Sequence, residues 1–256
     1  MLAAQRHEYL LEKLRTERKV VAKEVAAELR LSEDSIRRDL RELAAAGKCQ
    51  RVYGGALPIS AAIADYETRT ELNVVGKQSV ARAAAALIEP GQTVILDGGT
   101  TTLELVRELD RELALTVVTH SPTIAVALLG HPNIEVFMLG GRLFKHSAVT
   151  CGAAAVEAAA QVNADLFFVG VTGVHPETGF TTDDADEAAM KRTLARHSAD
   201  TYVLADADKI GTASRFVVLR APEIAGLITD APRSSPTLGL LAEGGLSITY
   251  ASTRQD

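Results

Sequence analysis

Residues 32–40, Ser32-Glu33-Asp34-Ser35-Ile36-Arg37-Arg38-Asp39-Leu40, form the stretch that decides the fold of the N-terminal part of the chain. Ile36, Leu40 and Leu43 follow one another at helical spacing, which predicts a helix with a single buried stripe. Ser32 is placed to cap this helix, because its hydroxyl can accept a hydrogen bond from a free N–H of the first turn. A short turn precedes Ser32, so we predict a helix-turn-helix.

The opposite face of this helix carries hydroxyl and guanidinium groups. At about 100° per residue, Arg38 and Arg41 point away from the apolar stripe, and Ser35 and Arg37 flank them. An arginine can bind guanine or phosphate through two hydrogen bonds, and a serine in the first turn can reach a phosphate oxygen. Arginine-rich faces are also common on solvated helices. This face therefore predicts contact with DNA only when the residues on either side of the helix in the sequence are considered as well.

The neighbouring residues predict the rest of a winged helix-turn-helix domain, the head, over residues 1–57. Two earlier helices are predicted from apolar residues at helical spacing, which are Leu10, Leu11 and Leu14, then Val21, Val25 and Leu29. Gly47 ends the third helix, and residues 48–56 predict a two-stranded wing with a basic rim. The predicted DNA contacts are Ser32, Ser35, Arg37, Arg38, Arg41, Lys48, Arg51 and Tyr53.

The charge of the chain is divided between a basic head and an acidic remainder. Residues 1–57 hold 12 Lys and Arg against 9 Asp and Glu, a balance of +3, whereas the remaining residues hold 15 against 24, a balance of −9. This asymmetry is expected if only the head meets a polyanion. It is a weak signal, because a small helical segment can reach +3 by chance.

Composition restricts the class of protein. The 256 residues are 47% hydrophobic and 23% charged, which is ordinary for a globular protein of one or two domains. Cys49 and Cys151 lie far apart and in no C-x-x-C motif, so we predict neither a disulfide framework nor a thiolate metal site, and we expect a reducing cytoplasm. No apolar run reaches the roughly 18 to 20 residues of a membrane span, and no signal peptide is evident.

The head resembles the DNA-binding domain of the DeoR/GlpR family of bacterial transcription regulators. That family's signature, Ser-x-x-Thr-Ile-Arg-Arg-Asp-Leu followed by Arg-x-His-Gly-Gly-Ala, corresponds to residues 32–40 and 51–56 of this chain. Ser35 replaces the usual Thr and loses a methyl group that could contact thymine, and Tyr53 replaces the usual His. The resemblance implies double-stranded operator DNA as a partner.

Residues 58–75 form a predicted linker, because they begin with a proline and lack apolar periodicity. The family resemblance implies that this segment couples the head to the remainder through residues that include Tyr66, Glu67 and Arg69.

Strands alternate with helices in residues 76–256, the predicted body. Short runs rich in β-branched residues predict strands at residues 93–96, 115–118, 134–139, 166–169, 202–204, 217–219 and 227–229. Ala-rich stretches predict helices at residues 80–88, 102–109, 123–129, 153–161 and 187–197. The expected fold class is therefore α/β, with a mostly parallel sheet covered on both faces behind the N-terminal winged helix-turn-helix.

The first predicted strand of the body ends in a phosphate-binding type of sequence, Asp97-Gly98-Gly99-Thr100-Thr101-Thr102. The glycines allow close approach of the backbone, and N–H groups and hydroxyls lie at the positive end of the next helix. The P-loop lysine is missing, so hydrolysis of a nucleoside triphosphate is not indicated. A capped strand-to-helix turn without a ligand would have the same sequence.

Other predicted strands also end in polar or glycine-rich residues, and such ends gather ligands at one edge of a parallel sheet. Lys191 and Lys209 are predicted partners of a phosphate, although either could be a solvated lysine, and Asp97 or Asp206 could accept from sugar hydroxyls. The predicted effector residues are Asp97, Gly98, Gly99, Thr100, Thr101, Thr102, His120, Ser121, Gly140, Gly141, Arg142, Gly170, Thr172, Gly173, Lys191, Asp206 and Lys209.

No metal, cofactor or catalytic residue is predicted. The acids at residues 183–187 are better explained by the dipole of the helix that follows them, because no calcium-loop pattern is present. The histidines show no paired metal-binding spacing, and only His120, at a strand end, is a candidate for the site. No Gly-x-Ser-x-Gly elbow occurs.

The DeoR/GlpR resemblance continues through the body to about Asp230, and the body also resembles ribose-5-phosphate isomerase in fold. Gly98 replaces the family's usual Ser and His120 its usual Asn, both where an effector would lie. The resemblance implies a repressor of a carbohydrate operon, relieved by a phosphorylated sugar and working as a dimer or tetramer. The alternative is a sugar-phosphate isomerase with a fused head, for which Glu187 or Asp184 could serve as the base.

Overall fold

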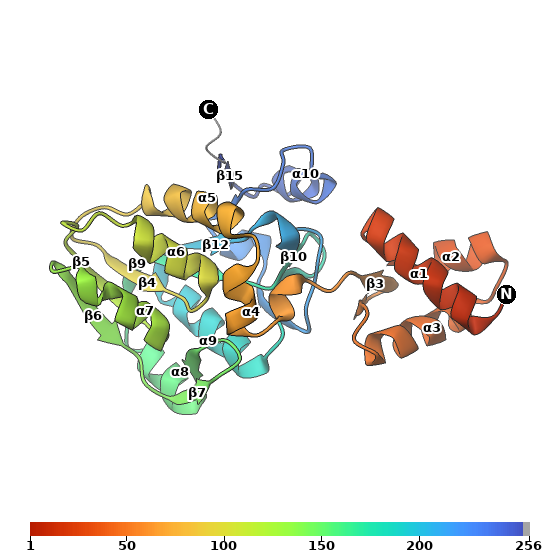
Figure 1. The fold of residues 1–256 in the computed structure, drawn as a ribbon, viewed down its shortest axis with the longest axis horizontal. Coiled ribbons are helices and arrows are strands. Elements are labelled where there is room, and N and C mark those ends of the chain that lie inside the picture. The colour runs from red at the N-terminus through yellow and green to blue at the C-terminus, as the bar shows by residue number, and fades with distance from the viewer. Residues whose placement is uncertain (253–256) are drawn as a thin grey trace.

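The computed structural model describes residues 1–252, and in Figure 1 these residues form a small head and a larger body joined by an extended segment. The predicted fold class is confirmed, because a winged helix-turn-helix precedes an α/β body with a parallel sheet. Within residues 1–252, none of the helices is both long enough and apolar enough to cross a membrane.

The head contains three helices and a three-stranded antiparallel sheet in the order β1-β3-β2. Its elements are α1 (Ala3–Glu17), β1 (Val20–Val21), α2 (Ala22–Leu29), α3 (Glu33–Ala45), β2 (Gln50–Val52) and β3 (Gly55–Leu57). The two predicted strands of the wing are present as β2 and β3, which pair antiparallel, but a third strand was not predicted. Val20 and Val21 add a third strand by pairing with β3, so Val21 precedes α2 instead of belonging to its buried stripe.

A buried ion pair joins the first and third helices of the head. Leu10, Ile36 and Leu40 are fully buried, as the helical spacing predicted. Beside them, both carboxylate oxygens of Asp39 accept hydrogen bonds from the Arg6 guanidinium, at 2.6 and 2.9 Å. Asp39 therefore has a structural role within the Arg-Arg-Asp-Leu signature, because it ties α1 to α3.

The segment predicted as a linker contains regular structure. The segment contains the 3-10 helix η1 (Ala61–Ile63) and α4 (Tyr66–Glu71), and its last two residues already belong to α5 (Val74–Ala85). Asp65 caps α4 and Asn73 caps α5 through their side chains. Apolar periodicity could not reveal α4, because this helix has six residues and none of them is fully buried.

The body is built on a seven-stranded sheet in which every neighbouring pair is parallel, in the order β15-β14-β12-β9-β4-β5-β6. Its strands are β4 (Thr93–Leu96), β5 (Leu115–Thr119), β6 (Ile134–Met138), β9 (Ala164–Gly170), β12 (Ser198–Leu204), β14 (Gly226–Thr229) and β15 (Ile248–Tyr250). Six of these seven strands were predicted, and β15 was not.

Helices cover both faces of this sheet, as predicted. One apolar core lies between the sheet and α5, α6 (Thr100–Glu108) and α7 (Pro122–Ala127), the last continued by η2 (Leu128–Gly130). The other lies against α8 (Ala153–Ala159), α9 (Ala185–Arg196) and α10 (Pro236–Glu243), of which α10 was not predicted.

Smaller strands lie outside the main sheet. The predicted strand at residues 217–219 is β13 (Phe216–Leu219), which pairs with β11 (Gly179–Thr182) in an antiparallel sheet completed by β10 (Gly173–His175). A hairpin of β7 (Arg142–Phe144) and β8 (Val149–Cys151) follows β6, and two short turns, η3 (Ala207–Lys209) and η4 (Ala221–Glu223), follow β12 and β13.

The order of the strands reverses between β4 and β9, which is where a parallel α/β sheet is expected to bind a ligand. From β4 the chain continues through β5 to β6 on one side, and then resumes at β9 on the other side. The connections on the two sides of this point leave in opposite directions, which opens a crevice at the carboxyl ends of the two strands.

The ion pair of Asp39 gives the first prediction. Burial raises the pKa of Asp39, but the hydrogen bonds and charge of Arg6 hold it below its ordinary 3.8. The pair therefore stabilises the head fully above pH 3.8, and this stabilisation is lost as pH falls through the lowered value. We expect Asp39→Ala to lower the unfolding free energy of the head by about 2 kcal/mol at pH 7.

The measurement is hydrogen exchange of the amides of α1 and α3 in the full chain. Glu33→Ala is the matched control, because Glu33 contacts only the exposed Arg37 at the surface of α3. Equal exchange in the two variants would contradict the structural role of Asp39.

Candidate functional site

The outward face of α3 presents the predicted DNA contacts in two different states. Ser32 caps the helix, and its hydroxyl lies 2.8 Å from that of Ser35. Arg37 is paired with Glu33 at 2.6 Å. Arg38 and Arg41 are exposed and form none of the ion pairs found in residues 1–252. These two guanidinium groups are therefore free to meet DNA, whereas Arg37 must first leave Glu33.

The wing presents an aromatic ring and two basic side chains to solvent. Tyr53 lies in the turn between β2 and β3 and is fully exposed, and Lys48 and Arg51 are also exposed. A fully exposed aromatic ring contributes favourable burial energy only when a binding partner covers it. The wing thus extends the basic face of α3.

A cavity, here called the strand-end cavity, lies over the carboxyl ends of β4, β9 and β12. It is lined by ten of the predicted effector residues, which are Gly98, Gly99, Thr100, Thr101, Thr102, Gly170, Thr172, Lys191, Asp206 and Lys209. It is also lined by nine residues outside that set, which are Ala61, Ala62, Arg69, Leu72, Asn73, Lys77, Val171, Glu187 and Asp208.

The other seven predicted residues do not line the cavity, and they are Asp97, His120, Ser121, Gly140, Gly141, Arg142 and Gly173. Asp97, His120 and Ser121 are fully buried. The segment 140–142 is exposed beyond β6, the edge strand on the far side of β5, and Arg142 pairs there with Asp186 at 3.0 Å. Gly173 is buried in β10.

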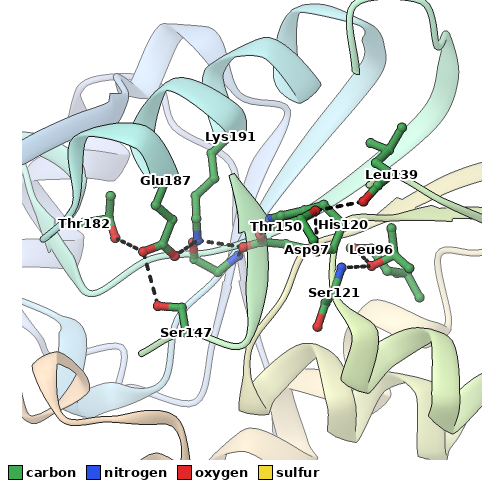
Figure 2. A network of polar contacts seen from close by, with 12 residues as sticks. Leu96, Asp97, His120, Ser121, Leu139, Ser147, Thr150, Thr182, Glu187 and Lys191 are labelled. Atoms are coloured by element: carbon green, nitrogen blue, oxygen red, sulfur yellow. Dashed lines mark hydrogen bonds and ion pairs between the residues drawn. The ribbon is translucent and has the colours of Figure 1, made fainter. Parts of the chain in front are cut away.

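Figure 2 shows a network of polar contacts that includes Glu187 and Lys191, two residues that line the cavity. Lys191 donates to Asp97 at 2.8 Å and to the carbonyl of Gly170 at 2.7 Å, and it pairs with Glu187 at 3.0 Å. Burial opposes the charge of Lys191, yet Asp97 and Glu187 hold its pKa above the ordinary value. Burial also opposes the charge of Glu187, whose pKa is nevertheless lowered, mainly by Lys191. Lys191 is therefore held charged between two carboxylates, and the group has no excess of positive charge.

His120 lies inside this network instead of facing a ligand. Its Nε2 atom is 3.4 Å from Asp97, and neither ring nitrogen forms a hydrogen bond within residues 1–252. Burial lowers the pKa of His120, so the ring is neutral at physiological pH.

The N-terminus of α6 supplies hydrogen-bond donors to the cavity. Gly99 precedes the helix with φ +133, a conformation that side chains other than glycine rarely adopt. The hydroxyls of Thr101 and Thr102 are buried and form no hydrogen bond within residues 1–252. Unsatisfied buried hydroxyls are costly, and an anion at the helix N-terminus would satisfy them.

Two cations that sequence reasoning did not assign to the site face this helix end. Lys77 of α5 donates to the carbonyl of Arg69, and neither residue belongs to the ion pairs of the described chain. Burial, and then Lys209, lowers the pKa of Lys77 to about 8. Burial also lowers the pKa of Arg69, whose Nε atom has no partner. Asn73, in the predicted linker, is a residue that can cap a helix. It was the sequence signal that could have indicated the start of α5 and so the position of Lys77 beside Arg69.

Gly98 lies so close to Val149 of the β7–β8 hairpin that a side chain at position 98 would collide with it. A Cβ atom at Gly98 would lie 2.0 Å from Cγ1 of Val149 and 3.3 Å from Cβ of Ser121. A serine would therefore require Val149 to move, so the departure from the family pattern has a packing cause.

The groups considered for metal binding and catalysis all have protein partners. In the acidic stretch, Asp184 caps α9 at 2.9 Å and Asp183 pairs with Arg215 at 3.3 Å. Glu187 accepts from Ser147 and Thr182 in addition to pairing with Lys191. Neither Asp184 nor Glu187 is thus a free base for isomerisation.

One further group, His7, Asp39 and Glu42, brings possible ligand atoms within 4.8 Å of one another. Both oxygens of Asp39 already accept from Arg6, which leaves no reason to place a metal there.

Comparison with known proteins places both parts of the chain in one family. A DeoR-like helix-turn-helix domain matches residues 6–62, and a DeoR C terminal sensor domain matches residues 72–231. The chain is 34% identical over 233 residues to an uncharacterized HTH-type transcriptional regulator FruR of Bacillus subtilis, covering 90% of this chain and 92% of the relative. It is 29% identical to the HTH-type transcriptional repressor GlcR of that species, covering 96% and 95%.

Among solved structures, ribose 5-phosphate isomerase A from Methanocaldococcus jannaschii is similar over 52% of each chain, with 19% identity and a TM-score of 0.39. The relatives in sequence are named as regulators and repressors, so the isomerase alternative is not favoured. The domain matches, the sequence relatives and the observed head and body agree: this chain belongs to the DeoR family of DNA-binding transcription regulators.

Proposed function

We propose that this protein is a repressor that leaves its operator when a phosphorylated sugar occupies the strand-end cavity. The observation that carries the proposal is that Lys77 and Arg69 line one cavity with the hydroxyls of Thr101 and Thr102. Within residues 1–252 the two cations form no ion pair and the two hydroxyls form no hydrogen bond. An anion placed there receives donors from a helix N-terminus and charge from two cations, which is the chemistry of a phosphate site.

Other residues that line the cavity support the sugar assignment. Asp206 and Asp208 supply carboxylate oxygens, and Asn73 supplies a side-chain amide. Carboxylates accept from hydroxyl groups, and amides both accept from and donate to them, so a polyol attached to the phosphate would find partners. Lys209, which also lines the cavity, is paired with Asp206 at 3.4 Å.

We assign operator binding to α3 and the wing of each head. Self-association of the body would hold such heads together. Paired heads would bind repeated or palindromic half-sites of double-stranded DNA in the cytoplasm, as a dimer or tetramer. Repression is supported by the relative GlcR of Bacillus subtilis, which is named a transcriptional repressor. The head is proposed to span residues 1–57, the connecting segment 58–75 and the body the rest.

Removal of the Arg38 guanidinium tests the DNA surface. We expect Arg38→Ala to weaken operator binding by roughly tenfold to a hundredfold in a mobility-shift titration, because one arginine contact to a base is worth about 1–3 kcal/mol. Arg107→Ala removes the same charge from an exposed site on the body, and should leave the affinity unchanged. Unchanged affinity in Arg38→Ala would refute the assignment of α3.

A thermal-shift panel tests the effector class. We expect hexose or pentose monophosphates, but not their free sugars, to raise the melting temperature, because only the phosphate satisfies the helix end. Thr101→Val should weaken the binding of the best panel member by about tenfold or more, since it loses a hydrogen bond to a charged group. Thr116→Val, on β5 outside the cavity, is the control. Equal stabilisation by phosphorylated and free sugars would disprove the phosphate assignment.

The lowered pKa of Lys77 predicts a pH dependence of effector binding. A sugar phosphate remains a dianion above pH 7, whereas Lys77 loses its proton near pH 8. Affinity measured by calorimetry should therefore fall above pH 8, by up to about tenfold per pH unit. In Lys77→Arg, which stays charged, affinity should remain level between pH 7 and about 9.5.

Stability without effector should change in the opposite sense. Folding lowers the pKa of Lys77 from 10.5 to about 8, so the unfolded chain binds more protons between these values and this lysine's contribution to stability rises with pH there. If the affinity of wild type for the sugar phosphate did not change across pH 8, Lys77 would not belong to the phosphate site.

A further inference from the structure

The body meets the head at the turn η3. The Arg18 guanidinium donates to the carbonyl oxygen of Ile210 at 3.4 Å. Within residues 1–252 this is the only side-chain hydrogen bond recorded between the head and the rest of the chain. In Figure 1, β10 and α10 lie on the side of the body that faces the head. A groove between the two parts is lined by residues of α1, the wing, β10, η3 and α10.

The same turn forms part of the strand-end cavity. Asp206 and Lys209 line that cavity and pair at 3.4 Å. Ile210 is the residue directly after Lys209, so the carbonyl that holds Arg18 is one peptide unit away from a cation of the cavity. Asp208 lines both the cavity and the groove.

Hydrogen bonds hold the backbone of the turn together. The N–H of Ala207 donates to Asp230 at 2.7 Å, the N–H of Gly211 donates to the carbonyl of Val174 at 2.8 Å, and the hydroxyl of Thr212 donates to the carbonyl of Lys209 at 2.8 Å. The side chain of Lys209 is paired with Asp206. An anion in the cavity would compete with Asp206 for Lys209, and because the backbone of the turn is tied together, a shift of Lys209 would move the turn and the carbonyl of Ile210 with it.

Two basic residues of the head and two acidic residues of the body line the groove. Arg18 and Lys19 lie on the side of the head, where the acidic Glu17 is already paired with Lys13 at 2.9 Å, and Glu177 and Asp208 lie on the side of the body. The head is therefore attracted to this face of the body in general, while the bond to Ile210 selects one arrangement.

We infer that η3 carries the effector signal to the head, and that Arg18 is the residue of the head that receives it. This inference rests on the proposed function, because it requires an anion at Lys209. Arg18 is a positioning residue here. It lies outside the strand-end cavity, and its contact with the body belongs to the arrangement of the two domains.

The test compares the operator affinity of Arg18 variants with and without a sugar phosphate. Arg18 ends α1 with φ +61, so Arg18→Asn and Arg18→Gly remove the guanidinium while keeping a residue suited to that conformation. Arg15→Ala is the control, because Arg15 is exposed on the same helix and contacts only Glu12. The DNA is an operator duplex selected from a random pool. The probe is the hexose or pentose monophosphate that gives the largest thermal shift in wild type.

For wild type and Arg15→Ala we expect the sugar phosphate to weaken operator binding by the same factor, within the usual range of about 5–150 for coupled sites. In both Arg18 variants this factor should fall toward one, while the sugar phosphate still raises the melting temperature as in wild type.

The possible failures are distinguishable. If wild type answers to no phosphorylated sugar, the proposed function fails and the inference falls with it. If wild type responds and the Arg18 variants respond by the same factor, η3 does not act through Arg18. If the variants without sugar phosphate bind the operator more weakly than wild type does with sugar phosphate, Arg18 contacts DNA, and the inference is again overturned.

Discussion

The ion pair between Asp97 and Lys191 is the interaction on which the body depends most. It lies almost fully inside the protein and joins the end of β4 to α9. Gly170 completes it, since its N–H donates to Asp97 and its carbonyl accepts from Lys191, so β9 is held as well. A buried pair recovers its desolvation cost only when its remaining hydrogen bonds are made, and Glu187 contributes here too. The pair thereby fixes the strand ends on either side of the crevice.

This network sets two carboxylates against one ammonium group, so it supplies no net positive charge that could attract an anion. Lys191 is shared by two carboxylates, and Lys209 is held by Asp206. The remaining positive charge comes from Arg69 and Lys77, which lie on α4 and α5, the elements that follow the wing in the chain. The same segment therefore joins the head to the body and carries the cations of the cavity.

The sequence predicted the elements that bury a periodic apolar surface, and it was less informative about those that do not. The stripes of α1 and α3 and six strands of the main sheet are in place. It missed β1, which depends on pairing between Val20 and Ala56, residues far apart in the chain. It also missed α4, whose caps and not its core define it.

In the site, the strand ends next to the crossover point were placed correctly beside the cavity, whereas those on β5 and β6 lie elsewhere. Strand-end chemistry alone does not reveal the order of strands in the sheet. Since only β12, β9 and β4 end at the cavity, His120 and Arg142 could not be separated from Lys209 before the topology was known.

The thin contact between head and body limits how strongly one site can influence the other. One hydrogen bond contributes about 0.5–1.5 kcal/mol, which is at most about tenfold in an equilibrium constant. The charges across the groove add little, because exposed pairs are screened by salt and solvent. A larger decrease in operator affinity requires two heads on one operator that both lose their contact with the body. The factors by which the two heads weaken binding then multiply. With such a contact, release from paired half-sites can be strong, while release from a single half-site stays weak.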